Sequence, residues 1–205
     1  MRQVIHRSRQ NSSYVGLRLI GASGVMGLIL NGLALFVSWS SAHAGDISLM
    51  AVGLRYGLSG SSPIGEQTQT DFHQYDVAAT LRLPWQWFHS SGWGLSTRLL
   101  VSGGALNGAH ETNLIATAVP VLAFGRNDDK FSVDMGGGGA LLSDHKFGVQ
   151  NFGGPFQFVW TFGANLGLIG PLGISYHFQH YSDATLYGHD SRGVDLHMFE
   201  LAYRF

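Results

Sequence analysis

The segment that decides the fold is residues 155–168, PFQFVWTFGANLGL, in which apolar and polar residues alternate. Successive side chains of a β-strand point to opposite faces of a sheet, so such a strand has one apolar and one polar face. The polar face carries Gln157, Thr161 and Asn165. The apolar face is rich in aromatic rings and consists of Phe156, Phe158, Trp160, Phe162, Ala164, Leu166 and Leu168. The segment therefore predicts a strand with an apolar environment on one face and a polar environment on the other.

The same period of two recurs from residue 46 to the end of the chain, and no helical period is sustained there. Strands of ten or more residues are long for a soluble protein and suit a tilted strand that crosses a bilayer. Tryptophan and phenylalanine on the apolar face are typical of the interfacial girdles of outer-membrane barrels. Eight strands are predicted, over residues 46–58, 72–87, 93–104, 111–124, 130–142, 155–168, 171–182 and 194–205. We therefore predict an all-β fold, an eight-stranded antiparallel transmembrane β-barrel; a soluble sandwich or lipocalin-like barrel is the alternative.

The connections between the predicted strands differ in length in a regular way. Those after the second, fourth and sixth strands are short, and most of the others are longer. Because outer-membrane barrels have short periplasmic turns and longer outer loops, we expect the segments 59–71, 105–110, 143–154 and 183–193 to face outward. The chain also ends FELAYRF, which resembles the C-terminal signal of bacterial outer-membrane proteins. The predicted location is the outer membrane of a Gram-negative bacterium.

Residues 1–44 differ from the rest of the chain. They contain four of the twelve basic residues and no acidic residue, and an apolar run leads to the small-x-small site Ala42-His43-Ala44. This pattern predicts a secretory signal peptide over residues 1–44 and a barrel over residues 45–205, with a membrane anchor as the alternative. The barrel segment keeps eight basic and 13 acidic side chains, a formal charge of −5. Without a basic patch, nucleic-acid binding is not expected.

Three polar residues near the C-terminus suggest a catalytic site: His180, Ser182 and Asp195. The apolar row of the segment 171–182 continues into His180 and Ser182, and counting back in steps of two from Phe205 places Asp195 on an outward face as well. Polar groups that face lipid are costly and are a functional hypothesis by default. The three residues therefore predict a Ser-His-Asp hydrolase triad, and three polar residues above the hydrocarbon are the alternative.

The stretch HYSDATLYGHDSRGVD, residues 180–195, resembles the outer-membrane lipid A 3-O-deacylases of the PagL type, whose signature is H-x-S-N followed by an N-x-G-x-E/D-like segment. The resemblance implies an enzyme that removes the ester-linked 3-hydroxyacyl chain from position 3 of lipid A without a cofactor. It implies that Ser182 is the nucleophile, His180 the general base and Asp195 the acid. The implied partners are lipid A or lipopolysaccharide and the outer membrane, and a homodimer is left open.

The sequence departs from this family pattern in three respects, one of which is a distance from Ser182 to Asp195 that is one residue longer. Asp183 follows the serine where asparagine is usual, and Ser191 stands two residues before Gly193 where asparagine is expected. An anion at Asp183 is expected to oppose an oxyanion, which is normally stabilised by neutral donors. The expected oxyanion donors are backbone N–H groups of residues 188–193.

The same residues also allow other functions. A non-catalytic barrel, either an adhesin or an envelope-stabilising protein, and a lipid A acyltransferase are the alternative functions. The chain has no cysteine, which excludes a disulfide scaffold and a cysteine-based metal site. The remaining histidines of the region, His177, His189 and His197, have no spacing that converges on a metal ion, so no metal is expected.

Overall fold

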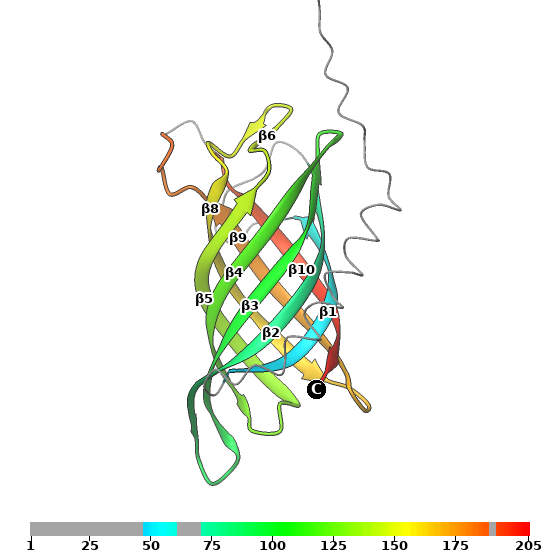
Figure 1. Cartoon of the computed structure of the whole chain (residues 1–205), viewed down its shortest axis with the longest axis vertical. Helices are drawn as coiled ribbons and strands as arrows, with labels where there is room; N and C mark the ends of the chain where they lie inside the picture. Colours follow the sequence, from blue (N-terminus) through cyan, green and yellow to red (C-terminus); the bar gives the residue numbers. More distant parts are fainter. Residues whose placement is uncertain (1–46, 61–70, 189–191) are drawn as a thin grey trace, which may run out of the picture. The chain divides into compact units, whose positions relative to one another are not determined.

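The computed structural model describes residues 47–60, 71–188 and 192–205 of the 205-residue chain. In these residues long β-strands form a closed antiparallel barrel in the order β1-β10-β9-β8-β5-β4-β3-β2 (Figure 1). Its strands are β1 (Ser48–Ser59), β2 (Phe72–Phe88), β3 (Trp93–Gly108), β4 (Glu111–Arg126), β5 (Phe131–Leu142), β8 (Phe156–Gly167), β9 (Leu172–Ser182) and β10 (Val194–Arg204). A separate small hairpin consists of β6 (Lys146–Phe147) and β7 (Gln150–Asn151). The predicted eight-stranded all-β barrel is confirmed, whereas the predicted signal peptide over residues 1–44 lies outside the described residues.

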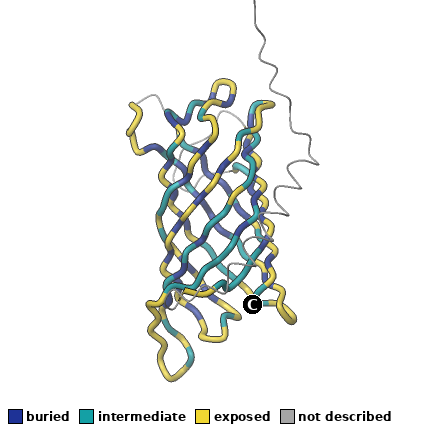
Figure 2. The backbone as a smooth tube through the Cα atoms, viewed as in Figure 1, coloured by how far each residue is buried: buried dark blue, intermediate teal, exposed yellow. Residues whose placement is uncertain are grey.

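Alternating burial follows directly from the alternating sequence. Buried and exposed residues alternate along the barrel strands (Figure 2), and β4 alternates without interruption from Ile115 to Arg126. The outward positions of β8 and β10 expose large apolar side chains such as Phe158, Trp160 and Leu201. The outer surface of the barrel is therefore apolar, as a lipid-facing surface requires.

Polar side chains fill much of the barrel interior. The buried pair of Arg55 Nη2 and Asp76 Oδ2 is 3.1 Å apart, and His177 Nε2 lies 3.0 Å from Asp134 Oδ1. Arg98 donates to Ser132 Oγ over 2.8 Å. Buried charges of this kind are tolerated when they are paired and hydrogen-bonded. Eight strands enclose an interior that is just wide enough to be filled by such side chains.

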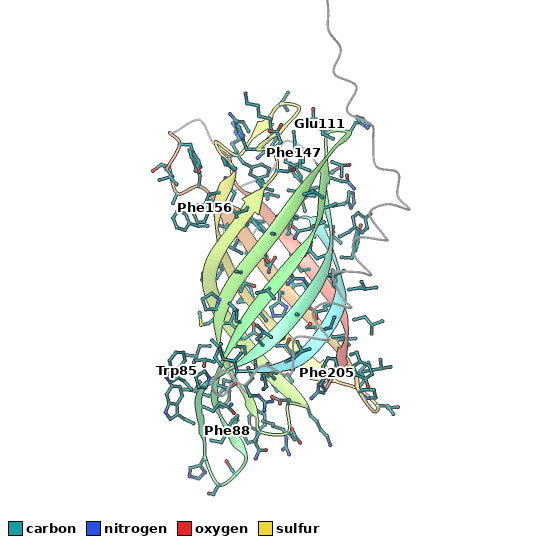
Figure 3. The ribbon with its side chains drawn as sticks, in the orientation of Figure 1. Trp85, Phe88, Glu111, Phe147, Phe156 and Phe205 are labelled. Atoms are coloured by element: carbon teal, nitrogen blue, oxygen red, sulfur yellow. The ribbon has the colours of Figure 1, made fainter. Side chains whose placement is uncertain are left out.

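The interior is apolar near the end that carries the β6–β7 hairpin. Phe72, Phe147 and Phe152 are fully buried, and their ring centroids lie 5.2–5.6 Å apart. Val194 and Leu196, the first inward residues of β10, belong to the same apolar cluster. Figure 3 shows Phe147 at this end, and Trp85, Phe88 and Phe205 at the opposite end. The cluster joins the small hairpin to the start of β10.

The segment at residues 46–58 forms β1, and its sequence alternates weakly because glycine occupies two of its inward positions. A Cβ at Gly57 would lie 2.2 Å from Met198 Sδ, and one at Gly53 would lie 2.6 Å from Glu200 Oε1. Side chains of the neighbouring strand β10 therefore occupy the space beside these glycines. Arg55 is the inward charged side chain between them, so the polar row of β1 is short in the sequence.

Two predicted outer loops differ from the structure. The segment 105–110 is not a loop: β3 continues to Gly108 and a two-residue turn at Ala109 and His110, with φ of 49° and 65°, leads into β4. Positive φ at both central residues is the geometry that matches the twist of a hairpin. The segment 143–154 contains the β6–β7 hairpin, whose two-residue strands are too short to give a periodic signal. The predicted strand end at residue 104 was therefore four residues early, and the predicted connection 143–154 contains a short hairpin; the outward direction of both segments stays a prediction.

Adjacent glycines on β3 give a test of the inside and the outside of the barrel. A Cβ at inward Gly104 would lie 1.9 Å from the carbonyl oxygen of Tyr75, whereas outward Gly103 has open space around it. We expect Gly104→Val to abolish the folded barrel, since overpacking costs about 1–3 kcal/mol or more, and Gly103→Val to fold normally. Heat-modifiable migration in gel electrophoresis measures the folded fraction of each variant, and equal folded fractions would show that the faces are assigned wrongly.

Candidate active site

His180 on β9 and Asp195 on β10 are direct partners across the two strands. Their side chains share the outward face, and His180 Nδ1 lies 2.5 Å from Asp195 Oδ1. Asp195 is only 2 % exposed, while the imidazole is partly open to the surroundings. A carboxylate bonded to Nδ1 fixes the tautomer and leaves Nε2 as the proton acceptor. The sequence-based pairing of these two residues is thus present in the structure.

Ser182 ends β9, two residues beyond His180 and on the same face. It is half-buried and lies opposite Phe158 of β8. Residues two apart on a strand are separated by about 6.6 Å along it, a distance that an imidazole and a hydroxyl can bridge between them. Among the described residues no hydrogen bond joins Ser182 Oγ to His180, and in unliganded sites such catalytic hydrogen bonds are often long or poorly aligned. Ser182 and the pair of His180 and Asp195 therefore share one face at the end of β9.

Two other histidines on outward rows have different partners. His73 Nδ1 lies 2.8 Å from the hydroxyl of Tyr56, and His197 Nδ1 lies 2.7 Å from the hydroxyl of Tyr176. Tyrosine at a membrane interface commonly bonds a polar group at its wet end. His180 Nδ1, by contrast, contacts the carboxylate of Asp195, which is the kind of partner that a general base needs.

Aromatic side chains of β8 flank the site. Trp160 lies directly opposite His180 and Phe158 opposite Ser182. Both rings are exposed on the outer surface, and Phe178, which is fully buried, packs against Trp160 with ring centroids 6.5 Å apart. The polar site thus borders an apolar, aromatic surface, which suits a substrate with a long hydrocarbon chain.

The carboxylate of Asp183 caps the turn that follows the serine. It accepts the backbone N–H groups of Thr185 over 3.1 Å and of Tyr187 over 3.2 Å, and the Asp183 carbonyl accepts that of Leu186 over 2.9 Å. Ala184 and Thr185 have φ of 50° and 64°, which is uncommon for a β-branched residue. Asp183 is buried and belongs to the row opposite to His180 and Ser182. Its charge is therefore directed at the backbone of the turn.

The expected oxyanion donors are partly engaged elsewhere. The N–H of Gly188 donates to the Thr185 carbonyl over 3.1 Å, and that of Arg192 donates to the Asn151 carbonyl over 2.9 Å. Ser191 lies outside the described residues. Gly193 immediately precedes β10, and its carbonyl accepts a hydrogen bond from Gln150 Nε2. These contacts tie the segment to the β6–β7 hairpin.

Sequence reasoning missed Gln150. Its side chain is fully buried and bonds the two residues that precede the strand of Asp195. A glutamine inside a predicted loop carries no periodic or motif signal, so nothing in the sequence singled it out.

Neither a metal centre nor a spanning helix emerges from the parts of the chain that the structure describes. Over residues 47–60, 71–188 and 192–205, no group of three or more histidine, aspartate or glutamate side chains is placed to hold a metal ion. Within those same ranges no helix is both long enough and apolar enough to cross a membrane.

A closed eight-stranded barrel with an apolar outer surface is the architecture of an outer-membrane protein. The family model of lipid A 3-O-deacylase (PagL) matches residues 73–204, and the chain belongs to this family. The barrel accordingly lies in the outer membrane of a Gram-negative bacterium, and the family implies ester hydrolysis of lipid A in general.

Two solved structures resemble the chain. The crystal structure of the outer membrane enzyme PagL has a TM-score of 0.62 and 20% sequence identity, over 76% of this chain and 99% of that chain. At this identity the likeness shows the fold. The backbone structure of the Yersinia pestis outer membrane protein Ail in a phospholipid bilayer nanodisc has a TM-score of 0.44 and 12% identity, over 77% of this chain and 99% of that chain. Among curated proteins no significant match is found.

The position of the site at the outer end can be tested by labelling. Val149, between β6 and β7, is 76% exposed, and Ile169, between β8 and β9, is 92% exposed at the opposite end. The chain has no cysteine, so Val149→Cys and Ile169→Cys each introduce a single thiol. We expect a membrane-impermeant maleimide to label Val149→Cys on intact cells and Ile169→Cys only after the outer membrane is permeabilised. The reverse pattern would place the site at the periplasmic end.

Proposed function

We propose that the protein is a serine esterase that removes the ester-linked 3-hydroxyacyl chain from position 3 of lipid A in the outer membrane. Ser182 is the nucleophile, His180 the general base and Asp195 the acid that orients it. The observation that carries the proposal is the 2.5 Å contact between His180 Nδ1 and Asp195 Oδ1 on the outward face of the barrel. Placing a carboxylate and an imidazole on a lipid-facing surface is energetically costly, and such residues therefore suggest a functional site.

The proposed reaction proceeds through an acyl-enzyme. Ser182 Oγ attacks the ester carbonyl while His180 Nε2 takes its proton, and Asp195 stabilises the imidazolium that forms. The tetrahedral intermediate collapses, and His180 returns the proton to the sugar oxygen as the ester bond breaks. Water then attacks the acyl-enzyme with His180 again as the base, which releases the fatty acid and regenerates the serine hydroxyl. These steps need no cofactor.

The surroundings of the site support a lipid substrate. Phe158 and Trp160 border Ser182 and His180 from β8, and their rings are exposed toward the bilayer. An acyl chain that lies along these rings would hold its ester carbonyl beside the serine. The sugar portion of lipid A would remain at the polar rim, near the loops that connect β9 to β10 and β5 to β8. The placement supports hydrolysis of a membrane lipid.

Removal of the nucleophile or the base tests the proposal directly. Ser182→Ala and His180→Asn should each lower deacylation on the order of 10³-fold or more, because the two groups act as a unit and either loss alone costs nearly as much as both. Asp195→Asn should lower the rate less completely, since it orients the imidazole and does not take the proton. Purified protein in detergent with lipid A as substrate, followed by mass spectrometry, gives the rates.

The same mass spectra distinguish the other functions. Loss of a hydroxyacyl chain supports the esterase, and gain of an acyl chain would identify an acyltransferase. Wild-type activity in Ser182→Ala would refute the triad. If the wild type and all variants are equally inactive, the protein is a non-catalytic barrel. Heat-modifiable migration confirms that each variant is folded.

Asp183 gives a test of the turn after the nucleophile. Asn retains one oxygen that can accept a backbone N–H, so Asp183→Asn should keep the turn and leave activity equal or higher. Asp183→Leu removes both acceptors for Thr185 and Tyr187 and should lower activity about 10-fold, since lost hydrogen bonds to a charged group are worth about 1.5–3 kcal/mol. Equal rates for Asp183→Leu and the wild type would show that the cap has no role in the site.

A further inference from the structure

We propose that Gln150 is a positioning residue that sets the orientation of Asp195 toward His180, and that the β6–β7 hairpin acts as a clamp on the start of β10. This inference rests on the proposed function, in which Asp195 orients the base. The hairpin would thus contribute to catalysis from a segment that does not itself touch the reacting atoms.

The clamp consists of hydrogen bonds in both directions. Gln150 Nε2 donates to the carbonyl oxygens of Arg192 over 3.0 Å and of Gly193 over 3.2 Å. The N–H of Arg192 donates to the carbonyl oxygen of Asn151 over 2.9 Å. The Gln150 side chain is fully buried, so its amide is shielded from water, and the two hydrogen bonds that it donates are part-buried. Residues 192 and 193 are therefore fixed to β7 by side chain and backbone together.

The hairpin is itself anchored at both sides. Phe147 and Phe152 are buried against Phe72 in the apolar cluster. Asp144 Oδ1 accepts the backbone N–H of Lys146 over 3.1 Å and that of His145 over 2.6 Å. The N–H groups of Lys146 and then His145 hold the pKa of Asp144 below its usual value. The carboxylate thus stays charged and caps the entry to β6.

A single residue separates the clamped Gly193 from Asp195. That residue, Val194, points inward and is buried in the same cluster as Phe147 and Phe152, as is Leu196 on the other side of Asp195. The backbone around Asp195 is therefore held by the hairpin through hydrogen bonds before it and by packing on both sides. A displacement of about 1 Å in a catalytic group can lower a rate about 10²-fold.

Asp195 depends on this backbone support because its side chain has little other support. Its Oδ1 bonds His180, while its Oδ2 is buried and has no hydrogen-bond partner within the described residues. Carboxylates that orient an imidazole are usually held by further donors. Here the direction of the carboxylate follows from the backbone to which it is attached, and that backbone is held by its pairing with β9 and by the Gln150 hydrogen bonds to the two residues just before β10.

Gln157 provides a matched control. It is also fully buried, and its Nε2 donates to the carbonyl oxygens of Phe152 over 2.9 Å and Gly154 over 2.8 Å. It braces the connection between β7 and β8 but makes no hydrogen bond to residues 192 and 193. Substitution of either glutamine would lower the stability of the loops in general. Only substitution of Gln150 should disturb the alignment of Asp195 with His180.

The kinetic experiment compares Gln150→Met with Gln157→Met, because methionine keeps the side-chain volume and removes the donors. With lipid A as substrate, Gln150→Met should lower kcat on the order of 10²-fold with KM changed about twofold or less, and Gln157→Met should change kcat about threefold or less. In the Asp195→Asn background Gln150→Met should cost little more, because both changes remove one function. Full additivity, or equal losses for both glutamines, would overturn the proposal.

A second readout does not depend on activity. The hydrogen bond between His180 and Asp195 should give a low-field proton resonance in NMR spectra of the protein in detergent, assigned by its loss in His180→Asn. The resonance should persist in Gln157→Met and shift or vanish in Gln150→Met and Asp195→Asn. An unchanged resonance in folded Gln150→Met would overturn the proposal. A shifted resonance in a protein without deacylase activity would support the clamp and reject the proposed function.

If Gln150→Met does not fold, Gln150→Asn takes its place in both measurements. Asparagine keeps the amide donor on a side chain that is one methylene shorter, so it should give a smaller loss of kcat and a smaller shift of the resonance. A wild-type rate and resonance in this variant, together with an equal effect of Gln157→Asn, would also overturn the proposal.

Discussion

The pairing of β1 with β10 closes the sheet, and every other feature depends on this closure. The ladder runs from Ala51 opposite Arg204 to Ser59 opposite Leu196. A bilayer offers no hydrogen bonds to the backbone, so a sheet with a free edge could not persist there. Closure also divides the side chains into two sets with opposite requirements, since inward residues must fill the interior and outward residues must match lipid. A polar residue in the outward set therefore suggests a functional role, whereas a polar residue on the surface of a soluble protein does not.

The outward histidines show how the barrel reconciles polar groups with lipid. His73 and His197 bond tyrosine hydroxyls, and in this arrangement the polar edge of each ring is satisfied within an otherwise aromatic surface. His180 bonds a carboxylate instead, and it lies near the end of its strand, where the bilayer gives way to the polar rim. His180 thus differs from these two histidines in having a contact between its Nδ1 and a carboxylate oxygen, which is the basis of its proposed role.

Much of the fold could be predicted because parity along a strand is rigid. Once residues 155–168 had indicated a strand, counting in steps of two placed His180, Ser182 and Asp195 on one face, and the structure shares that assignment. The same counting failed for residues 105–110, because in the continuation of β3 the apolar Leu106 is buried inside and the polar Asn107 lies on the outward row, the reverse of the pattern in residues 155–168. It could not reveal the contact of Gln150 with residues 192 and 193. That contact joins two connections through their tertiary fold, and no local pattern in either connection specifies it.

In the proposed function, the outward direction of the His180 and Asp195 pair changes the meaning of substrate concentration for this protein. A site that opens into a bilayer meets its substrate by lateral diffusion within one leaflet, so the relevant quantity is the mole fraction of the lipid among its neighbours. Dilution of the leaflet by other amphiphiles would then slow encounter even at constant total substrate, whereas dilution of the surrounding water would not. The orientation of one strand face thereby converts a three-dimensional search into a two-dimensional one.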